Sequence, residues 1–77
     1  MTGVLLYDPV RALRTPSPRE FECLRHLANG LEDGEIAKRL GITNRTVRFH
    51  IDNVKRRLAA NNRAHLVALA TREGLID

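Results

Sequence analysis

Residues 41–58, with the sequence GITNRTVRFHIDNVKRRL, decide the fold of this chain. Thr43 is placed to cap a helix, because a threonine side-chain oxygen can accept a hydrogen bond from an N–H of the first turn. After it, apolar residues recur at intervals of four, three and four positions, which is the spacing of one stripe on an α-helix. The stripe consists of Val47, Ile51, Val54 and Leu58. The segment is therefore predicted to form a helix over residues 44–59 that one side anchors to the rest of the chain.

The other sides of this helix carry mostly polar and basic side chains. Arg45, Phe49, Asp52 and Arg56 fall opposite the stripe, Arg48 and Lys55 on one flank, and Thr46, Asn53 and Arg57 on the other. Residues 43–63 contain six basic side chains and one acidic one, whereas residues 1–42 are balanced and the whole chain carries +4. A positive charge gathered on one helix suits a polyphosphate partner, although a solvated basic face is the simpler alternative. We interpret the segment as a recognition helix for double-stranded DNA.

The composition describes one small domain and argues against several classes of protein. The chain has 77 residues, of which 43% are hydrophobic and 4% aromatic, so its core must consist of Leu, Ile, Val and Ala. Its one cysteine, Cys23, cannot form an intramolecular disulfide and is expected to pack as a small hydrophobe. No spacing suits a metal or a cofactor, no nucleophile–base pair suits an enzyme, and no apolar run approaches the ~18 residues of a membrane span. We expect a cytoplasmic protein without metal, cofactor, membrane contact or enzymatic activity.

Two helices are predicted ahead of the recognition helix. The sequence Ser17-Pro18-Arg19-Glu20 starts the first, over residues 18–29, because Ser17 can cap it and Glu20 can complete a capping box. The second covers residues 33–40 and turns three apolar residues inward. Gly41 then begins a tight turn into the basic helix. A short helix, a turn with glycine and a longer basic helix form the pattern of a helix-turn-helix.

A fourth helix is predicted over residues 63–73, ending at Gly74. Six of the seven residues from 64 to 70 are apolar, which is more than one face of a terminal helix can bury in so small a core. We therefore predict a homodimer joined through this helix, in an interface made of Ala64, Leu66, Val67, Ala68 and Leu69. The fold class is thus all-α, a four-helix bundle formed by residues 16–77. Residues 1–15 form an N-terminal extension or arm, of which residues 4–7 could add to the dimer interface.

Three motifs follow one another along residues 16–51. They are PSPRE at 16–20, G-x4-EIA-x2-L-x-IT at 30–43, and TVRFHI at 46–51. In this order they resemble the LuxR/GerE-type helix-turn-helix, whose opening is matched at four of five positions and whose third segment is matched in full. The resemblance implies a DNA-binding four-helix domain that places its third helix in the major groove and pairs through its fourth. Since the chain begins at Met1 without a sensor domain, we expect a stand-alone small regulator of transcription.

The chain departs from the family pattern in two places. Relatives usually have Gly-Val where Ala59-Ala60 stand, so the turn before the fourth helix can differ here. Relatives also often have a small or polar residue at the position of Phe49 and a basic or polar one at that of Asp52. The family's target sequence therefore does not carry over to this chain.

We assign base reading to Arg45, Arg48, Phe49 and Asp52. Arg48 can bind guanine bidentately, and a phosphate contact is equally consistent with its position. Phe49 can meet a thymine methyl or a neighbouring protein surface. Asp52 can accept from cytosine N4, but we favour an ion pair with Arg48 or Arg56 one turn away. Phosphate contacts, which position the helix without specifying sequence, are assigned to Thr43, Thr46, Asn53, Lys55, Arg56, Arg57 and Arg63. His50 is expected to flank the core or to donate to a phosphate.

Two other functions are consistent with the sequence. Region four of a sigma factor shares the Glu-Ile-Ala and Thr-Val pattern, but the apolar fourth helix argues against it. A protein-interaction module that binds a sigma factor or RNA polymerase is the other alternative. The four arginines at 48, 56, 57 and 63 argue against that module, whereas Phe49 and Asp52 favour it.

Overall fold

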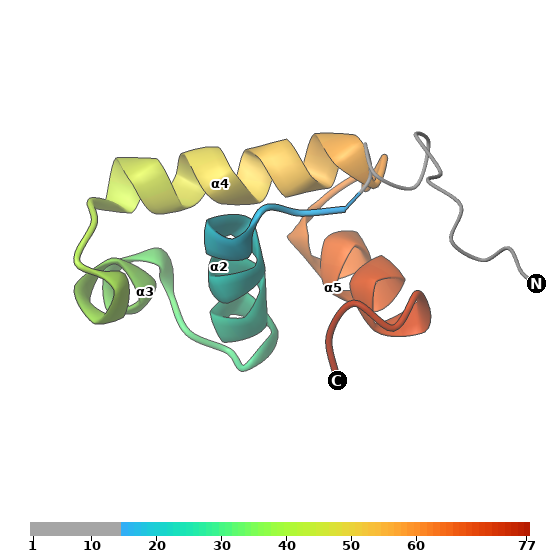
Figure 1. Ribbon diagram of the computed structural model, residues 1–77, viewed down its shortest axis with the longest axis horizontal. Coiled ribbons are helices and arrows are strands. Elements are labelled where there is room, and N and C mark those ends of the chain that lie inside the picture. Colours follow the sequence, from blue (N-terminus) through green and yellow to red (C-terminus); the bar gives the residue numbers. More distant parts are fainter. Residues whose placement is uncertain (1–14) are drawn as a thin grey trace, which may run out of the picture.

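Residues 15–77 are described by the computed structural model, and they fold into four helices with no strand among them (Figure 1). The helices are α2 (Pro18–Ala28), α3 (Asp33–Leu40), α4 (Asn44–Arg57) and α5 (Arg63–Arg72). The all-α class and the four predicted helices are confirmed, with ends within two residues of the predicted ones. Residues 1–14 lie outside the described residues, and with them nearly all of the predicted N-terminal extension.

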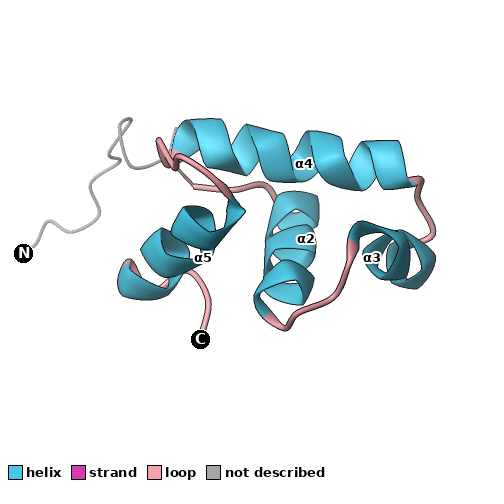
Figure 2. Cartoon of the chain, turned by 180° about the vertical axis from the view of Figure 1, so that it is seen from behind, coloured by secondary structure: helices cyan, strands magenta, loops and turns pink. Residues whose placement is uncertain are grey.

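α4 lies lengthwise across the other three helices. In Figure 1, α3, α2 and α5 follow one another beneath it, and Figure 2 shows the same arrangement from behind. The helix-turn-helix consists of α3 and α4, and Gly41 between them adopts a left-handed φ of 68° that ends α3. Because the other helices pack against one side of α4, its opposite side stays open along the length of the helix.

Polar side chains cap three of the helices as their residue types require. Ser17 Oγ accepts from the Glu20 N–H at 3.2 Å, and Glu20 Oε1 accepts from the Ser17 N–H at 3.0 Å, which is the predicted capping box. Thr43 Oγ1 accepts from the Thr46 N–H at 3.0 Å and caps α4. Asn62 Oδ1 accepts from the His65 N–H at 2.8 Å and caps α5. The caps satisfy N–H groups that have no partner within their helices.

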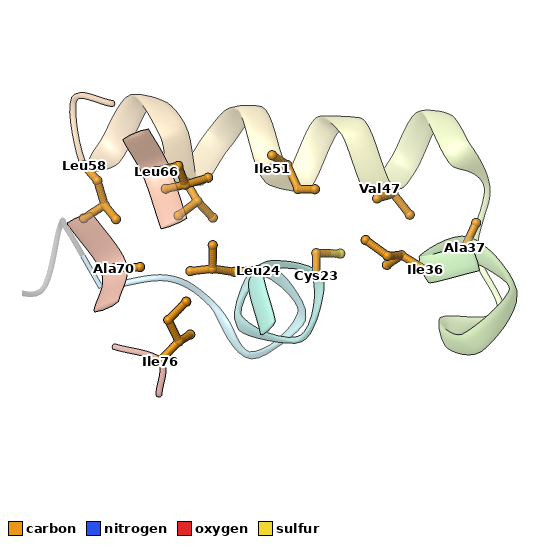
Figure 3. Packing of buried hydrophobic residues seen from close by; sticks show 11 residues of the cluster. Cys23, Leu24, Ile36, Ala37, Val47, Ile51, Leu58, Leu66, Ala70 and Ile76 are labelled. Carbon is orange, nitrogen blue, oxygen red and sulfur yellow. The ribbon is translucent and has the colours of Figure 1, made fainter. Parts of the chain in front are cut away.

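The inward stripe of α4 forms the centre of the core (Figure 3). Val47, Ile51 and Val54 are fully buried and Leu58 is 3% exposed, as the sequence predicts. They pack with Cys23 and Leu24 of α2, Ile36 and Ala37 of α3, Leu66 and Ala70 of α5, and Ile76 after α5. Burial of these apolar groups is the main force that fixes the orientation of α4.

Two core residues bear on further predictions. Cys23 is fully buried, and desolvation raises the pKa of its thiol, so it packs as the predicted small hydrophobe. Leu66 is fully buried as well, because α5 turns Leu66 and Ala70, four residues apart, toward the same core. Its side chain has no exposed area to offer a second subunit. The prediction that Leu66 contributes to a dimer interface is therefore wrong.

The turn between α4 and α5 contains an alanine in a conformation that favours glycine. Ala59 has a φ of 56°, the only positive φ among the described residues other than glycine. The Ala60 N–H donates to the Lys55 carbonyl at 2.9 Å, and the Ala59 N–H donates to the Arg56 carbonyl at 3.2 Å. These two bonds form a Schellman motif, which requires the left-handed residue between them. Ala59 thus adopts a conformation that suits glycine, at the expense of backbone strain.

Candidate nucleic-acid interface

The open side of α4 is polar and mostly basic, with one large apolar side chain. Arg45, Arg48 and Arg56 are exposed, and Asp52 is half-buried. Phe49 is 58% exposed and is the only large hydrophobic residue exposed in the described part of the chain. The helical phase predicted from the sequence is therefore confirmed, because the residues placed opposite the buried stripe face outward. Of the four predicted base readers, Arg45, Phe49 and Asp52 lie on this side. Arg48 lies on its flank, with Nε 3.9 Å from Asp33 Oδ2 of α3.

The beginning of α4 presents two hydroxyl groups. Thr43 Oγ1 and Thr46 Oγ1 lie 2.9 Å apart, within hydrogen-bond distance of each other. Thr43 also holds the cap of α4, so the two hydroxyls are fixed at the N-terminal end of the helix. This end carries partial positive charge from unpaired N–H groups, which suits an anion.

Asp33, at the start of α3, connects three helices through ion pairs. Its Oδ1 and Oδ2 accept from Arg63 Nη1 and Nη2 of α5 at 2.6 and 3.0 Å, a bidentate arrangement. Arg48 Nε of α4 lies 3.9 Å from Asp33 Oδ2. The hydrogen bonds from Arg63 lower the pKa of Asp33, and the same bonds raise the pKa of Arg63. The carboxylate therefore stays charged and holds the N-terminal end of α5 against that of α3.

A second ion pair fastens the end of α4 to the start of α2. Arg57 Nη1 donates to Glu20 Oε1, the same oxygen that accepts from the Ser17 N–H. The Glu20 side chain is only 5% exposed, so this carboxylate requires partners for both its charge and its lone pairs. Arg57 and Arg63 are both predicted phosphate contacts, and any such contact has to coexist with an internal ion pair.

Sequence reasoning missed both pairs, because their partners lie 37 and 30 residues apart along the chain. No periodic pattern joins residues at such separations. Glu20 is predicted to complete a capping box, which explains part of its position but leaves out the arginine that it binds.

Asp52 pairs with a different residue from those predicted. Its Oδ1 lies 4.0 Å from Lys55 Nζ, three residues further along α4. Arg48 is turned toward Asp33, and Arg56 donates to Asn53 Oδ1 on its own helix. The predicted pairing with Arg48 or Arg56 is therefore wrong, because both guanidinium groups have nearer acceptors. At 4.0 Å and with 44% of its side chain exposed, Asp52 is only loosely held.

His50 lies beside Phe49 at the edge of the core. Its ring meets the Phe49 ring edge-on, with centroids 5.9 Å apart and planes at 60°. The residue is half-buried, which agrees with the predicted place flanking the core. Its Nδ1 is buried and has no hydrogen-bond partner among residues 15–77.

The outward side of α5 is small and apolar. Ala64 and Ala68 are exposed, whereas Val67 and Leu69 are half-buried and pack partly against the core. With Leu66 removed from the set, four of the five predicted interface residues keep exposed area. Such a face allows close approach of a second helix.

No group of three or more His, Cys, Asp or Glu within 15–77 could hold a metal ion. None of the helices α2 to α5 is long and apolar enough to cross a membrane.

Comparison with known proteins identifies relatives of this architecture. Residues 15–70 match the family described as "Bacterial regulatory proteins, luxR family". The HTH-type quorum sensing-dependent transcriptional regulator VjbR of Brucella ovis is 48% identical over 61 residues, covering 79% of this chain and 24% of VjbR. The transcriptional activator protein AhyR of Aeromonas hydrophila is 41% identical over 69 residues, covering 90% of this chain and 25% of AhyR.

A third relative, the HTH-type quorum sensing-dependent transcriptional regulator RpaR of Rhodopseudomonas palustris, is 46% identical. The match covers 99% of this chain and 35% of RpaR. The chain thus spans between 24% and 35% of the length of these three relatives.

Proposed function

Because the chain belongs to the luxR family of bacterial regulatory proteins, we propose that it binds double-stranded DNA sequence-specifically and regulates transcription, with α4 in the major groove. One observation carries the proposal. The inner stripe of α4 is fully buried while its outer side is exposed along the helix and mostly basic. A major groove about 12 Å wide admits one α-helix presented in this way. The family is one of regulatory proteins, and no enzymatic activity is proposed.

Within this proposal the outer side of α4 divides into two sets of side chains. Base edges are read by Arg45, Arg48, Phe49 and Asp52. Phosphates are bound by side chains of α4 that flank these residues, by its cap and by the start of α5: Thr43, Thr46, Asn53, Lys55, Arg56, Arg57 and Arg63. Phosphate contacts set the register of the helix, and contacts with base edges give the preference for a sequence.

The working unit is proposed to be a homodimer joined through α5. The support is the exposed small face of Ala64 and Ala68, flanked by the half-buried Val67 and Leu69. An interface of this kind is small, about 600–1,000 Å² in total, below the usual range of stable dimers. The subunits would therefore pair weakly in solution and firmly on DNA, where two half-sites about 10 base pairs apart hold them side by side.

Selection of binding sites from random duplexes tests the DNA proposal. Arg48→Ala should relax the preference at one base pair, because it removes the guanidinium group that binds one base edge. The discrimination lost at that position should be about 1–3 kcal/mol. Arg56→Ala should weaken all sequences alike, because it removes a phosphate contact. If both variants lose affinity while the selected sequence stays the same, Arg48 is not a base reader.

Sedimentation with a duplex that carries two half-sites tests the dimer. Ala68→Glu should abolish cooperative binding of two subunits, because it places a charge in the apolar contact. Ala68→Ser, which keeps the side chain small and uncharged, is the matched control and should bind as the wild type does. Cooperative binding by Ala68→Glu would exclude α5 as the interface.

A protein-interaction module is the second candidate, and the exposed Phe49 is the observation that favours it. Its partner would be RNA polymerase or a sigma factor. A DNA-binding regulator can also contact polymerase through another surface. Failure to bind any duplex at low salt would favour the module over the regulator.

A further inference from the structure

We propose that Phe49 recognises the C5-methyl group of a pyrimidine in the major groove, and hence binds thymine or 5-methylcytosine but neither uracil nor cytosine. The inference deepens the proposed function and rests on it. It states that one side chain recognises a methyl group and not a pattern of hydrogen-bonding groups.

The position of Phe49 limits what the ring can meet. The other helices pack against one side of α4 and leave the opposite side open (Figure 1). Phe49 is 58% exposed. Val47 and Ile51, two residues before and after it, are fully buried, so the backbone that carries the ring is anchored on the opposite side. The edge-on contact with the half-buried His50, at 5.9 Å between centroids, gives the ring a fixed neighbour. The ring is therefore presented to the outside by a rigid element.

The surroundings of Phe49 favour nucleic acid over a protein surface. Arg45 and Asp52, four residues before and three after it, share its side of the helix, and Arg48 precedes it. Arg45 and Arg48 are exposed guanidinium groups. An apolar protein patch would have to desolvate these charges, whereas phosphates on either side of a groove would pair with them.

The chemistry of the groove leaves one partner for a phenyl ring. The major-groove edges of the bases present N7, O6, O4 and amino groups, all of which are polar, and the C5-methyl of thymine is the one apolar group. 5-Methylcytosine presents the same methyl beside an amino donor, where thymine has a carbonyl acceptor. A ring without polar atoms cannot tell these two apart, so it reads the methyl alone.

The position of Asp52 relative to the methylated base determines whether the chain prefers thymine or 5-methylcytosine. Its carboxylate is loosely held, 4.0 Å from Lys55 Nζ, and lies one turn from Phe49 on the same side. A carboxylate accepts from the amino group of cytosine and is repelled by the carbonyl of thymine. Contact of both side chains with one base would favour 5-methylcytosine, and contact of Asp52 with a neighbouring base would favour thymine.

The test uses duplexes selected by the wild-type chain and by Phe49→Ala in parallel. The wild type should prefer thymine at one position where the variant shows no preference. Replacing that thymine with deoxyuridine should weaken wild-type binding about three- to fivefold, the effect of one methyl removed from an apolar contact. The same replacement should leave Phe49→Ala unchanged. Phe49→Leu, which keeps an apolar side chain, should retain part of the discrimination.

A second set of duplexes carries cytosine or 5-methylcytosine, paired with guanine, at that position. Methylation of this cytosine should raise the affinity of the wild type about three- to fivefold and leave the affinity of Phe49→Ala unchanged. The ratio between the thymine and 5-methylcytosine duplexes identifies the source that the chain prefers, and Asp52→Asn should change that ratio.

The possible results distinguish a failure of the proposed function from a failure of the methyl contact. A chain that selects no sequence overturns the proposed function and the methyl contact with it. A chain that selects a sequence but gains no affinity at any position from a C5-methyl group, on thymine relative to deoxyuridine or on 5-methylcytosine relative to cytosine, overturns the methyl contact alone. Thermal unfolding of Phe49→Ala should match the wild type, so that loss of discrimination reflects recognition and not folding.

Discussion

Asp33 connects three helices, because its carboxylate pairs with side chains of both α4 and α5. It accepts two hydrogen bonds from Arg63 and lies 3.9 Å from Arg48, and only 17% of its side chain is exposed. Asp33→Asn should lower the free energy of unfolding at pH 7 by about 1–2 kcal/mol, because it leaves two guanidinium groups facing each other without the carboxylate. Urea denaturation measures the difference, and Asp77→Asn, at the exposed C-terminus, is the control expected to change nothing.

The same residue predicts a dependence on pH. The hydrogen bonds from Arg63 hold the pKa of Asp33 below its ordinary value of 3.8. The stability that the pair contributes is therefore complete above that value and is lost as the pH falls through the lower pKa of the folded state. The gap between wild type and Asp33→Asn should close as the pH falls below about 4. A gap that remained constant to the point of acid unfolding would contradict this role.

At the scale of elements, the turn between α4 and α5 predicts a variant that is more stable than the wild type. Ala59 has a φ of 56°, which strains any residue with a Cβ. Ala59→Gly should raise the free energy of unfolding by about 0.5–1 kcal/mol, the relief of strain less the added freedom of the unfolded chain. The thermal midpoint should rise by several degrees. Ala60→Gly, the same change one residue later at a side chain that packs on the core, should destabilise instead.

The elements themselves were predictable because local rules determine them. The cap at Thr43, the capping box at Ser17 and the stripe of α4 depend on residues within one or two turns, so spacing alone predicts them. The same spacing predicts that Phe49 faces outward. Pairings across the bundle depend on where helices meet, which no local pattern specifies. Glu20 with Arg57, and Asp33 with Arg63, were missed for that reason, and Leu66 was placed on the wrong side of α5 because that helix is apolar nearly all round.

At the scale of the whole molecule, less positive charge is available to DNA than the sequence suggests. Of the six basic residues in 43–63, Arg57 and Arg63 are hydrogen-bonded to carboxylates of other helices. If these two arginines keep their carboxylates on DNA and the other four basic residues reach it, log affinity should fall with log salt by a slope of about −3 to −4 per subunit, and the proposed phosphate contacts of Arg57 and Arg63 would be excluded. Arg56→Ala should reduce that slope by about one. A slope near −6 would mean that Arg57 and Arg63 exchange their carboxylates for phosphates on binding.

The place of α2 determines how the molecule folds. Cys23 and Leu24 lie beneath α4 in Figure 3, between the residues of α3 and those of α5, and Glu20 binds the last turn of α4. Helices α3 and α4 by themselves would leave the inner stripe of α4 in water over most of its length, and a helix of eight residues such as α3 does not persist alone. The described helices should therefore unfold together, in one all-or-none transition. The helix-turn-helix is a unit of recognition, whereas the unit of cooperative folding includes all of the helices around α2.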